Sequence, residues 1–409
     1  MLNYVKLAFR NIFRNRTRTF ITVAAVFCAV IFAMLMRSMQ FGTYDNMIQN
    51  VVGFYTGYAK VNQKGFWEEK SLDNTLLDSP ALRQKIIADP NVKSVVPRLE
   101  TFALAASEEL TKGVIVTGID PIAEANVSDV EAKMVDGNYF ALNDKSVIVS
   151  TGLAEFLEIE IGDTLVLLGQ GYQQISAAGK YPVVGTMKFG SPDLNANMVF
   201  MPLLAAQYLY GCEDRLTSII PIVNKIKRID RAKTSLQSSL GEEYEVLAWS
   251  DMLPELIQLI EADNTGGKVM LSILYIIIGF GMFGTILMMT TERLYEFGVL
   301  ISIGMKRWKL ILVIIMESLF INFLGVIIGM VLGFPILYYF FKNPIQLNKF
   351  GGNLDDFSEQ YNIEPVLNFS LDPEVFYSQG IYVFIIACII TAYPIWKLWK
   401  LNVIGALRG

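Results

Sequence analysis

The sequence predicts an α-helical membrane protein with four transmembrane helices, both termini in the cytoplasm, and a large α+β extracytoplasmic domain between helices 1 and 2. The 409 residues are 53% hydrophobic and only 18% charged, which is too apolar for an ordinary soluble domain. Several runs that are almost free of charge reach the roughly 20 residues that a helix needs to cross a bilayer. The basic residues gather beside these runs, which gives the orientation.

The spans follow from the charge-free runs at 19–36, 269–291 and 375–396, and from a fourth run that only Glu317 interrupts. We expect transmembrane helices at 19–40, 268–291, 310–341 and 375–396. The first run is too long for the apolar part of a signal peptide, and no A-x-A-like site follows it before Arg37, so it should be an uncleaved anchor.

The charges on the two sides of the membrane differ in sign. Segments 1–18, 292–309 and 397–409 carry 12 basic and two acidic residues, which makes them cytoplasmic by the positive-inside rule. Segment 37–268 carries 20 basic and 30 acidic residues, and 342–374 carries two and six, so both should lie outside. Nothing in this distribution suggests a nucleic-acid partner.

The cytoplasmic N-terminal segment, 1–18, has an amphipathic pattern. One helical face carries apolar residues and another carries basic ones, namely Leu2, Val5, Phe9, Ile12 and Phe13 against Lys6, Arg10 and Arg14. Such a helix would lie along the anionic inner leaflet of the membrane. The alternative is a disordered basic tail.

The extracytoplasmic domain, 41–265, alternates short strands and helices. Capping residues predict helices from Ser79-Pro80 to about Asp89 and from Ile229 to Leu240 with Gly241 as the stop. Strands are expected at 57–62, 92–97, 102–106, 113–118 and 245–249. These form α+β flanks, about 45–137 and 211–263, around an inserted β-rich subdomain at about 138–210.

The inserted subdomain should contain a short helix and four strands. The helix is expected at 151–157 and the strands at 146–150, 164–168, 182–185 and 198–201. Residues 168–181 are rich in Gly and Gln and lie between two strands, so we expect a protruding loop there.

Several kinds of chemistry are excluded by composition. The chain has no His, and its three cysteines are dispersed at Cys28, Cys212 and Cys388, so a Ser/His/Asp triad, an ordinary zinc site and a disulfide framework are not expected. The phosphate-binding motif G-x-x-x-x-G-K-[ST] is also missing from the sequence. We therefore expect no enzyme activity and no cofactor or metal in this chain.

The charged segment between the second and third spans predicts a short amphipathic helix at 292–308. Leu294, Phe297, Ile301 and Trp308 fall on one helical face. The acids Glu292 and Glu296, with Arg293, are expected near its start, where negative charge suits the helix dipole, and Gly304 ends it. The alternative is a helix that only floats at the lipid interface.

Four sequence stretches resemble the permeases of the MacB/FtsX/LolC–LolE superfamily, the type VII ABC transporters. The pattern E-R-x-x-E-F-G-x-L-x-x-I-G-M starts at Glu292, and LAFRNIFRNRTRTFITV covers residues 7–23. TGLAEFLEIEIGDTL is similar to the family's outer-domain signature, and Pro394 with the final LNVIGALRG resembles its closing segment. The layout is closest to the lipoprotein-releasing permeases.

This resemblance implies that ATP and Mg are bound by a separate ABC ATPase dimer, and that the permease works with a second permease, either a copy of itself or a homologue. It also implies a bacterial inner-membrane protein with its large domain in the periplasm. The ATPase-coupling residues would be Glu292, Arg293, Glu296, Phe297, Gly298, Gly304 and Met305.

The resemblance also implies a function, the extraction of lipoproteins or other lipidated or amphipathic substrates from the outer leaflet of the inner membrane. Acyl chains would enter a cavity between spans one and two, lined by Met34, Met36, Met39, Phe41, Met47, Val269, Met270, Ile273 and Leu274. These residues could instead be plain lipid contacts or helix packing. A loop of Gln170, Gly171, Tyr172, Gln173, Gln174 and Ile175 would contact a periplasmic lipoprotein carrier.

Other functions remain open at this stage. The chain could be an FtsX-like transmitter that activates a periplasmic partner without transport, a MacB-like exporter of peptides or drugs, or a membrane scaffold. An intramembrane carboxylate such as Glu317 is a functional candidate by default, but we expect a hydrogen-bonded structural role for it.

Overall fold

The computed structural model describes residues 9–10, 16–189, 192–346 and 366–402. The chain divides into two compact units. The helical unit contains Met1–Asp45, Leu259–Phe350 and Val366–Gly409, and the sheet unit contains Asn46–Gln258 and Gly351–Pro365. Most of the predicted N-terminal amphipathic helix and the C-terminal residues 403–409 lie outside the described residues.

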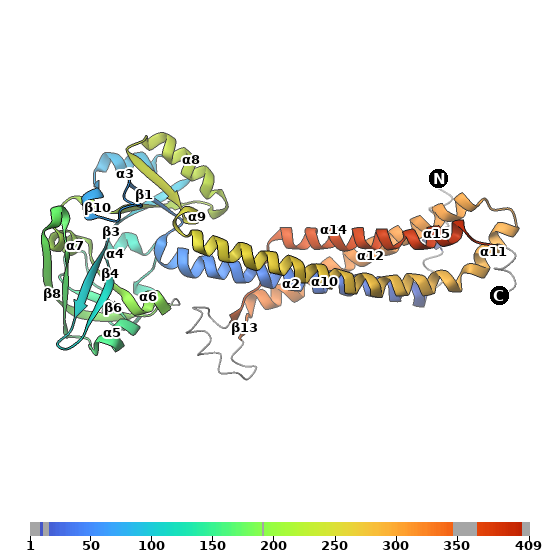
Figure 1. The fold of residues 1–409 in the computed structure, drawn as a ribbon, viewed down its shortest axis with the longest axis horizontal. Coiled ribbons are helices and arrows are strands. Elements are labelled where there is room, and N and C mark those ends of the chain that lie inside the picture. Colours follow the sequence, from blue (N-terminus) through green and yellow to red (C-terminus); the bar gives the residue numbers. More distant parts are fainter. Residues whose placement is uncertain (1–8, 11–15, 190–191, 347–365, 403–409) are drawn as a thin grey trace. The chain divides into compact units, whose positions relative to one another are not determined.

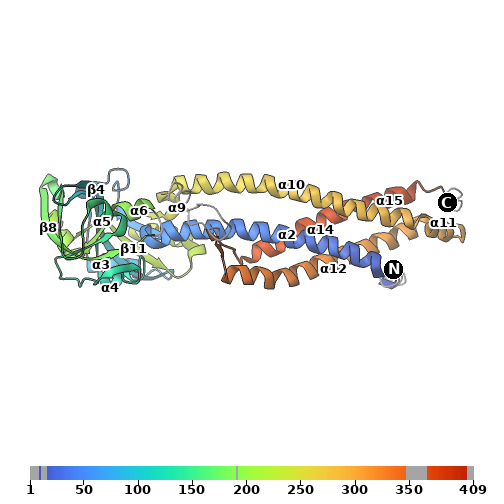
Figure 2. The same cartoon turned by 90° about the horizontal axis from the view of Figure 1, so that it is seen from below.

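Four helices within the described residues are long and apolar enough to cross a membrane. In Figures 1 and 2 these helices run side by side. The helices of this part of the chain are α2 (Arg16–Ile48), α10 (Pro254–Glu292), α11 (Leu294–Ser302), α12 (Arg307–Lys342), α14 (Pro373–Ile390) and α15 (Ala392–Trp399). A small antiparallel pair, β13 (Ile345–Gln346) and β14 (Val366–Leu367), connects α12 to α14.

Three of these helices differ from the predicted spans. Helix α2 covers Arg16–Ile48 and so continues beyond the predicted end at residue 40. Helix α10 begins at Pro254 rather than near residue 268, because the charged residues ahead of the apolar run continue the helix. The predicted fourth span is divided at Thr391, between α14 and α15.

Glycines bring α2 and α12 into close contact. A Cβ atom added at Gly325 would lie 2.8 Å from Cβ of Val26, and one added at Gly329 would lie 2.9 Å from Cβ of Val30. Gly333 repeats the contact one turn later, against Met34. Successive glycines of α12 lie four residues apart, and so do their partners on α2, so the two helices run in the same direction. They pack in the manner of small-xxx-small membrane helices.

Polar side chains join α2 to neighbouring segments of the helical unit. The Arg37 guanidinium donates to Asn264 Oδ1 at 2.9 Å, and the Tyr44 hydroxyl donates to Asp263 Oδ2 at 2.6 Å. The buried Ser38 hydroxyl donates to the backbone oxygen of Ser370 at 2.6 Å. The extra turns of α10 therefore supply partners for α2.

The sheet unit is built on one mixed sheet of ten strands. Nine strands follow the order β12-β1-β11-β3-β4-β9-β6-β8-β5, and β7 pairs with both β3 and β8. The strands are β1 (Ala59–Gln63), β3 (Val92–Ala106), β4 (Thr111–Ile119), β5 (Met134–Gly137), β6 (Val147–Ser150), β7 (Thr164–Gln170), β8 (Ser176–Met187), β9 (Met198–Pro202), β11 (Ser218–Val223) and β12 (Tyr244–Ala248). A separate pair is formed by β2 (Leu76–Leu77) and β10 (Arg215–Leu216).

Helices and a buried apolar core accompany the sheet. The α-helices are α3 (Pro80–Ile87), α4 (Pro121–Glu124), α5 (Thr151–Leu157), α6 (Pro192–Asn197), α7 (Leu203–Tyr210), α8 (Ile229–Leu240) and α9 (Trp249–Met252). Short helical turns lie at η1 (Gln49–Thr56), η2 (Leu72–Asn74), η3 (Glu131–Lys133), η4 (Tyr172–Gln174) and η5 (Ile226–Arg228). The main core joins side chains of α3, α5, α7 and α8 to the strands, for example Ile86, Leu157, Tyr210 and Leu236.

The local predictions for helices are confirmed at α5 and α8, and Ser79 caps α3 as expected by accepting from the Leu82 amide. The strands predicted at 92–97 and 102–106 are confirmed as extended chain, but their separation is wrong, and so is the predicted loop at 168–181. Residues 92–97 and 102–106 belong to one continuous strand, β3, in which Pro97 fits because its fixed φ is compatible with an extended chain. The predicted protruding loop at 168–181 is largely a hairpin of β7 and β8, paired up to Gln170 and Ser176.

Hydrogen bonding crosses the predicted border between the α+β flanks and the inserted β-rich subdomain. Strand β4 pairs in parallel with β9, and the second half of β3 pairs with β7. The inserted strands therefore extend the same sheet as the flanks.

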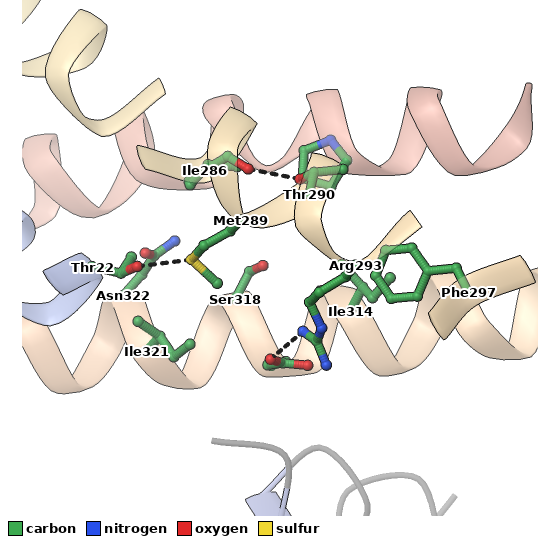
Figure 3. Close-up of a pocket in the computed structure, with 12 residues that line it drawn as sticks. Thr22, Ile286, Met289, Thr290, Arg293, Phe297, Ile314, Ser318, Ile321 and Asn322 are labelled. Atoms are coloured by element: carbon green, nitrogen blue, oxygen red, sulfur yellow. Dashed lines mark hydrogen bonds and ion pairs between the residues drawn. The ribbon is translucent and has the colours of Figure 1, made fainter. Parts of the chain in front are cut away.

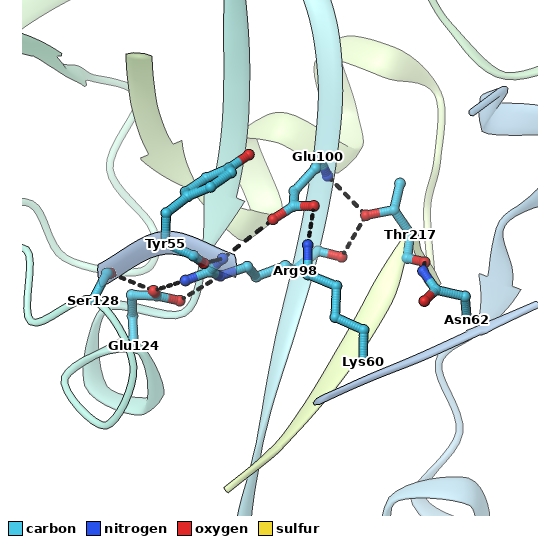
Figure 4. Close-up of polar contacts among 8 residues, drawn as sticks. All are labelled: Tyr55, Lys60, Asn62, Arg98, Glu100, Glu124, Ser128 and Thr217. Carbon is cyan, nitrogen blue, oxygen red and sulfur yellow. Dashed lines mark hydrogen bonds and ion pairs between the residues drawn. The ribbon is translucent and has the colours of Figure 1, made fainter. Parts of the chain in front are cut away.

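A buried ionic network lies where η1 meets the sheet (Figure 4). The fully buried Arg98 pairs with Glu124, with a 3.0 Å bond from Nε to Oε2, and its Nη1 lies 3.2 Å from Glu100 Oε1. Arg98 also donates to the backbone oxygen of Tyr55. Lys60 completes the network at 2.6 Å from Glu100. Two cations and two carboxylates thus balance one another inside the unit.

The glycine contact gives a stability prediction. Gly329→Leu should lower the free energy of unfolding by about 1–3 kcal/mol, because the new side chain overlaps Val30. Gly281→Leu is the matched control, since a Cβ at Gly281 meets no heavy atom within 4 Å. Thermal unfolding of both purified variants measures the difference, and equal melting temperatures would contradict this packing.

Candidate functional site

The chain between α10 and α12 turns twice within a few residues. Helix α10 ends at Glu292, and Arg293, with φ −97° and ψ 0°, separates it from α11. Glu292 therefore lies at the C-terminus of α10, and its predicted place at the start of the short helix is wrong. Helix α11 covers 294–302 rather than 292–308, and Gly304 follows it at φ 102°, a conformation that glycine adopts without strain.

The inner face of α11 packs on the ends of other helices. Phe297 is 4% exposed and belongs to a cluster with side chains of α12, of α15 and of the chain after α15, with Leu294, Ile301 and Met305 partly buried beside it. The cluster's other buried members are Leu310, Ile311, Ile314, Leu398 and Leu401. The predicted apolar face is confirmed for Leu294, Phe297 and Ile301, but Trp308 is 57% exposed and takes no part in it.

The outer face of α11 and the turn after it expose apolar side chains. Tyr295 is 58% exposed, Leu300 is 40% exposed and Ile303 is 80% exposed, with the exposed Glu296 among them. Such a mixed apolar and acidic surface on a short, well-anchored helix has the composition of a contact surface.

Arg293 connects the turn to the first third of α12. Its Nη1 donates to Glu317 Oε1 at 2.6 Å, and its Nε lies 3.6 Å from Glu296 Oε2. Figure 3 shows Arg293 extending toward α12 beside Phe297, and the guanidinium lies 5.4 Å from the Phe297 ring centroid. Because Glu317 is only 6% exposed, loss of either partner would leave an uncompensated charge in an apolar place.

A cavity of about 40 Å³ adjoins this ion pair. Its lining includes Thr22 of α2, Met289 and Arg293 near the end of α10, and Glu317 and Asn322 of α12. Within the described residues, Glu317 Oε2 and Asn322 Nδ2 have no hydrogen-bond partner, whereas Thr22 donates to Met289 Sδ at 3.0 Å. The size and polarity of this cavity suit one or two water molecules.

The sequence identified both ends of this ion pair without pairing them. Glu317 stood out as the single charge inside a span, and Arg293 as the first basic residue after another span. The expected structural role of Glu317 agrees with the observed bond to Arg293. Thr22 and Asn322 were missed, because neutral polar residues in an apolar helix give no signal unless their partner helix is known.

The predicted cavity residues are spread over different environments. Val269, Met270 and Ile273 are more than half exposed, and Met36, Met39, Phe41, Met47 and Leu274 are partly buried. Met34 is fully buried against Gly333, so its assignment to an open cavity is wrong. An apolar groove of about 550 Å³ lies elsewhere on α10, between Tyr275, Phe280 and Phe283 and the Ile386–Ile390 end of α14.

The predicted carrier-contact residues form the tip of the β7–β8 hairpin. Gly171 is buried, and Tyr172 lies under the Arg215 guanidinium, 4.3 Å from its ring centroid. The Gln173 amide donates to Asp73 Oδ1 at 2.6 Å. Gln170, at the end of β7, and Gln173, Gln174 and Ile175 are exposed, but the contacts of Gly171, Tyr172 and the Gln173 amide hold the tip as a packed turn.

Two family models match the chain. The MacB-like periplasmic core domain model matches residues 19–239, and the FtsX-like permease C-terminal model matches residues 268–403. The chain is also similar to "Lipoprotein-releasing system transmembrane protein LolC" of Xylella fastidiosa, at 22% identity over 79% of each chain. The LolC of Neisseria meningitidis serogroup B is 21% identical over 64% of this chain and 65% of its own length.

The "Macrolide export ATP-binding/permease protein MacB" of Brucella abortus is 23% identical over 80% of this chain, which spans about half, 52%, of that protein. Among solved structures, the periplasmic region of MacB from Actinobacillus actinomycetemcomitans covers 52% of this chain at 16% identity with a TM-score of 0.36. That score is too low to support an argument.

A double-mutant cycle tests the buried pair. Arg293→Gln and Glu317→Gln should each destabilise the protein by about 3–5 kcal/mol, because each leaves the partner charge buried and alone. The double variant should lose less than the sum of the two single losses, by up to about 3 kcal/mol.

The exposed pair Lys233–Asp251 is the control, with side chains 35% exposed and an expected coupling below about 1 kcal/mol. Denaturant unfolding in detergent measures both cycles. Strictly additive losses at Arg293 and Glu317 would show that the pair does not interact.

Proposed function

Since this chain belongs to the ABC transporter permease family with a MacB-like periplasmic core domain and an FtsX-like C-terminal region, we propose that it couples ATP hydrolysis by a partner ATPase to movement of an extracytoplasmic domain. The sequence carries no G-x-x-x-x-G-K-[ST] motif, so on this proposal ATP and Mg are bound by the partner. The domain between the first two spans would lie in the periplasm and the termini in the cytoplasm.

The observation that carries the proposal is the two-sided character of α11. Its inner face is held by Phe297 against α12 and Leu398, while its outer face leaves Tyr295, Leu300 and Ile303 exposed. A helix held in this way can receive a partner on one side and pass its displacement to the spans on the other. The predicted coupling residues fit this division, since Phe297 and Gly298 are buried while Glu292, Glu296 and Gly304 are exposed.

Two permease chains are required by this proposal. ABC ATPases act as dimers, and one chain offers a single α11 to receive one ATPase subunit. The second permease would be a further copy or a homologue.

We propose lipidated or amphipathic molecules as the substrate class. The similarity to proteins named as lipoprotein-releasing permeases supports this choice, and so do the exposed apolar side chains of Val269, Met270 and Ile273 on α10. The similarity to proteins named for macrolide export supports a wider range of amphipathic cargo. Acyl chains would contact α10 and Met36 and Met39 of α2, and a periplasmic carrier would receive lipoproteins released in this way.

The first test concerns ATPase contact. Leu300→Asp with Ile303→Asp should leave the folded protein intact, because both side chains are exposed, and should weaken ATPase association by roughly 30-fold or more, as loss of an interface hot spot does. The tagged protein is purified from its native membranes and its co-purifying chains are identified by mass spectrometry. An ABC ATPase is expected with the unmodified protein.

Ile226→Asp is the control for an apolar-to-acidic change, since Ile226 is 48% exposed in the sheet unit. It should retain the ATPase. If no ATPase accompanies the unmodified protein, or if the α11 variant retains it fully, the coupling role fails.

The second test concerns the substrate. Met39→Asp and Leu274→Asp should each block release of a fluorescent lipidated peptide from proteoliposomes while ATPase association persists, since a carboxylate against acyl chains costs several kcal/mol. Met39→Leu keeps volume and polarity and should release the peptide at the unmodified rate. Unchanged release in both Asp variants, with the ATPase still bound, would favour a transmitter without transport.

A further inference from the structure

The sheet unit contains a pocket of about 210 Å³ whose lining includes three residues of the ionic network in Figure 4, namely Tyr55, Lys60 and Glu100. Its lining comes from β1, the segment after it, β3 and β4, together with Tyr55 and Thr56 at the end of η1 and Met252 and Leu253 ahead of α10. The pocket therefore touches both segments that connect the sheet to long helices. None of its lining residues belongs to the site around α11.

Lys60 places a buried cation in this pocket. Its side chain is 3% exposed, and within the described residues Glu100 Oε2, at 2.6 Å, is the only hydrogen-bond acceptor of its ammonium group. An ammonium carries three donors, so two N–H bonds remain without an acceptor. The Tyr55 ring, with its centroid 5.8 Å away, offers only a weak cation–π contact.

The unused donors of Lys60 call for a hydrogen-bond acceptor, and the nearby charge of Lys70 favours a negative one. Burial lowers the pKa of Lys60, and Arg98 lowers it further, while Glu100 acts in the opposite direction. Glu100 is already shared between Lys60 and Arg98, so its oxygens are occupied. Lys70 adds another positive charge at the exposed side of the pocket. An acceptor with one negative charge would satisfy the free Lys60 donors.

The walls of the pocket are apolar and aromatic. Phe66 and Met252 are buried, Trp67 and Ile115 are partly buried, and Phe102 is 64% exposed at the open side. The Lys70 ammonium lies 4.4 Å from the Trp67 ring centroid, which keeps that ring in place beside the cation. Apolar walls with a few fixed polar groups are the usual composition of a small-molecule site.

We propose that this pocket binds a small monocarboxylate with an aromatic or aliphatic body. The carboxylate accepts from Lys60, with Lys70 at the entrance, and the apolar body lies between Trp67 and Phe102. A phosphate group is a poorer fit, because its second negative charge would need more donors than Lys60 and Lys70 present. The site is independent of the proposed transport function, since it requires neither ATPase nor lipid substrate.

A ligand in this pocket would contact both connecting segments at once. Tyr55 and Thr56 are the last residues of η1, and Met252 and Leu253 lie immediately before α10. Binding should therefore slow amide hydrogen exchange at 52–58 and 249–255, which a charge effect at the surface would not do.

The test uses 3-phenylpropionate with the full-length protein in nanodiscs, and its uncharged amide as the matched ligand. Isothermal titration should show saturable binding of the acid, at least tenfold tighter than the amide, with slower exchange in both connecting segments. Lys60→Met should abolish the preference for the acid. Equal binding of acid and amide, or no saturable binding of the acid, would overturn the proposal and leave bound water as the partner of Lys60.

Exposed positions keep the test decisive if Lys60→Met does not fold. Lys70→Gln and Phe102→Ser should each weaken acid binding at least threefold, because both residues line the pocket. Their controls are Lys64→Gln and Leu104→Ser, which change an exposed lysine and an exposed apolar residue of β3 outside its lining. Equal affinities in the pocket variants and the controls would also overturn the proposal.

Discussion

The close contact of α2 with α12 is the interaction on which the helical unit depends. In a membrane the lipid tails are as apolar as the side chains, so helices associate by packing rather than by the hydrophobic effect. Three glycines, each one turn after the last, let Val26, Val30 and Met34 approach the α12 backbone closely. One turn before the first of these glycines, Asn322 opens the small polar cavity that also contains Thr22 and Glu317. The glycine stripe thus sets both the register of the two helices and the depth at which their polar residues meet.

The sheet unit depends on a different constraint, the balance of buried charge. Burial alone would raise the pKa of Glu100, but the positive charges of Lys60 and Arg98 outweigh that effect and hold it below its usual range. Arg98 also holds the backbone of Tyr55, so the same network that satisfies the charges fixes the end of η1 on the sheet. Lys60 is the member whose donors are not all used, and this is why the pocket that it lines differs from an ordinary surface depression.

The parts of the fold that local signals determine could be predicted from the sequence. Helix α8 ends where expected because Gly241 follows its last turn at a positive φ, and Ser79 caps the start of α3 as its sequence indicates. The long α10 was not predicted, since its charged first turns look like a loop when only apolar length is counted. The β7–β8 hairpin was also missed, because its Gly and Gln residues are typical of loops and only the pairing of the two strands holds them in a sheet. Met34 could not be assigned from the sequence, because a thioether side chain occurs both in lipid-facing cavities and in contacts between helices. Its contact with Gly333, which is distant in the sequence, decides between the two.

On the proposed function, the same contacts give α11 a continuous mechanical connection to the spans. If a partner displaces the outer face of α11, Phe297 would move the apolar cluster at the start of α12. Arg293 would at the same time pull on Glu317, further along the same helix. Helix α12 is in turn packed on α2 through Gly325 and Gly329, so it cannot slide without moving α2 or losing that packing. Arg293 has a second carboxylate within reach, Glu296, at the longer distance of 3.6 Å. On the proposed function, a movement of α11 that broke the bond to Glu317 would still leave Arg293 beside Glu296, so its charge would keep a carboxylate nearby.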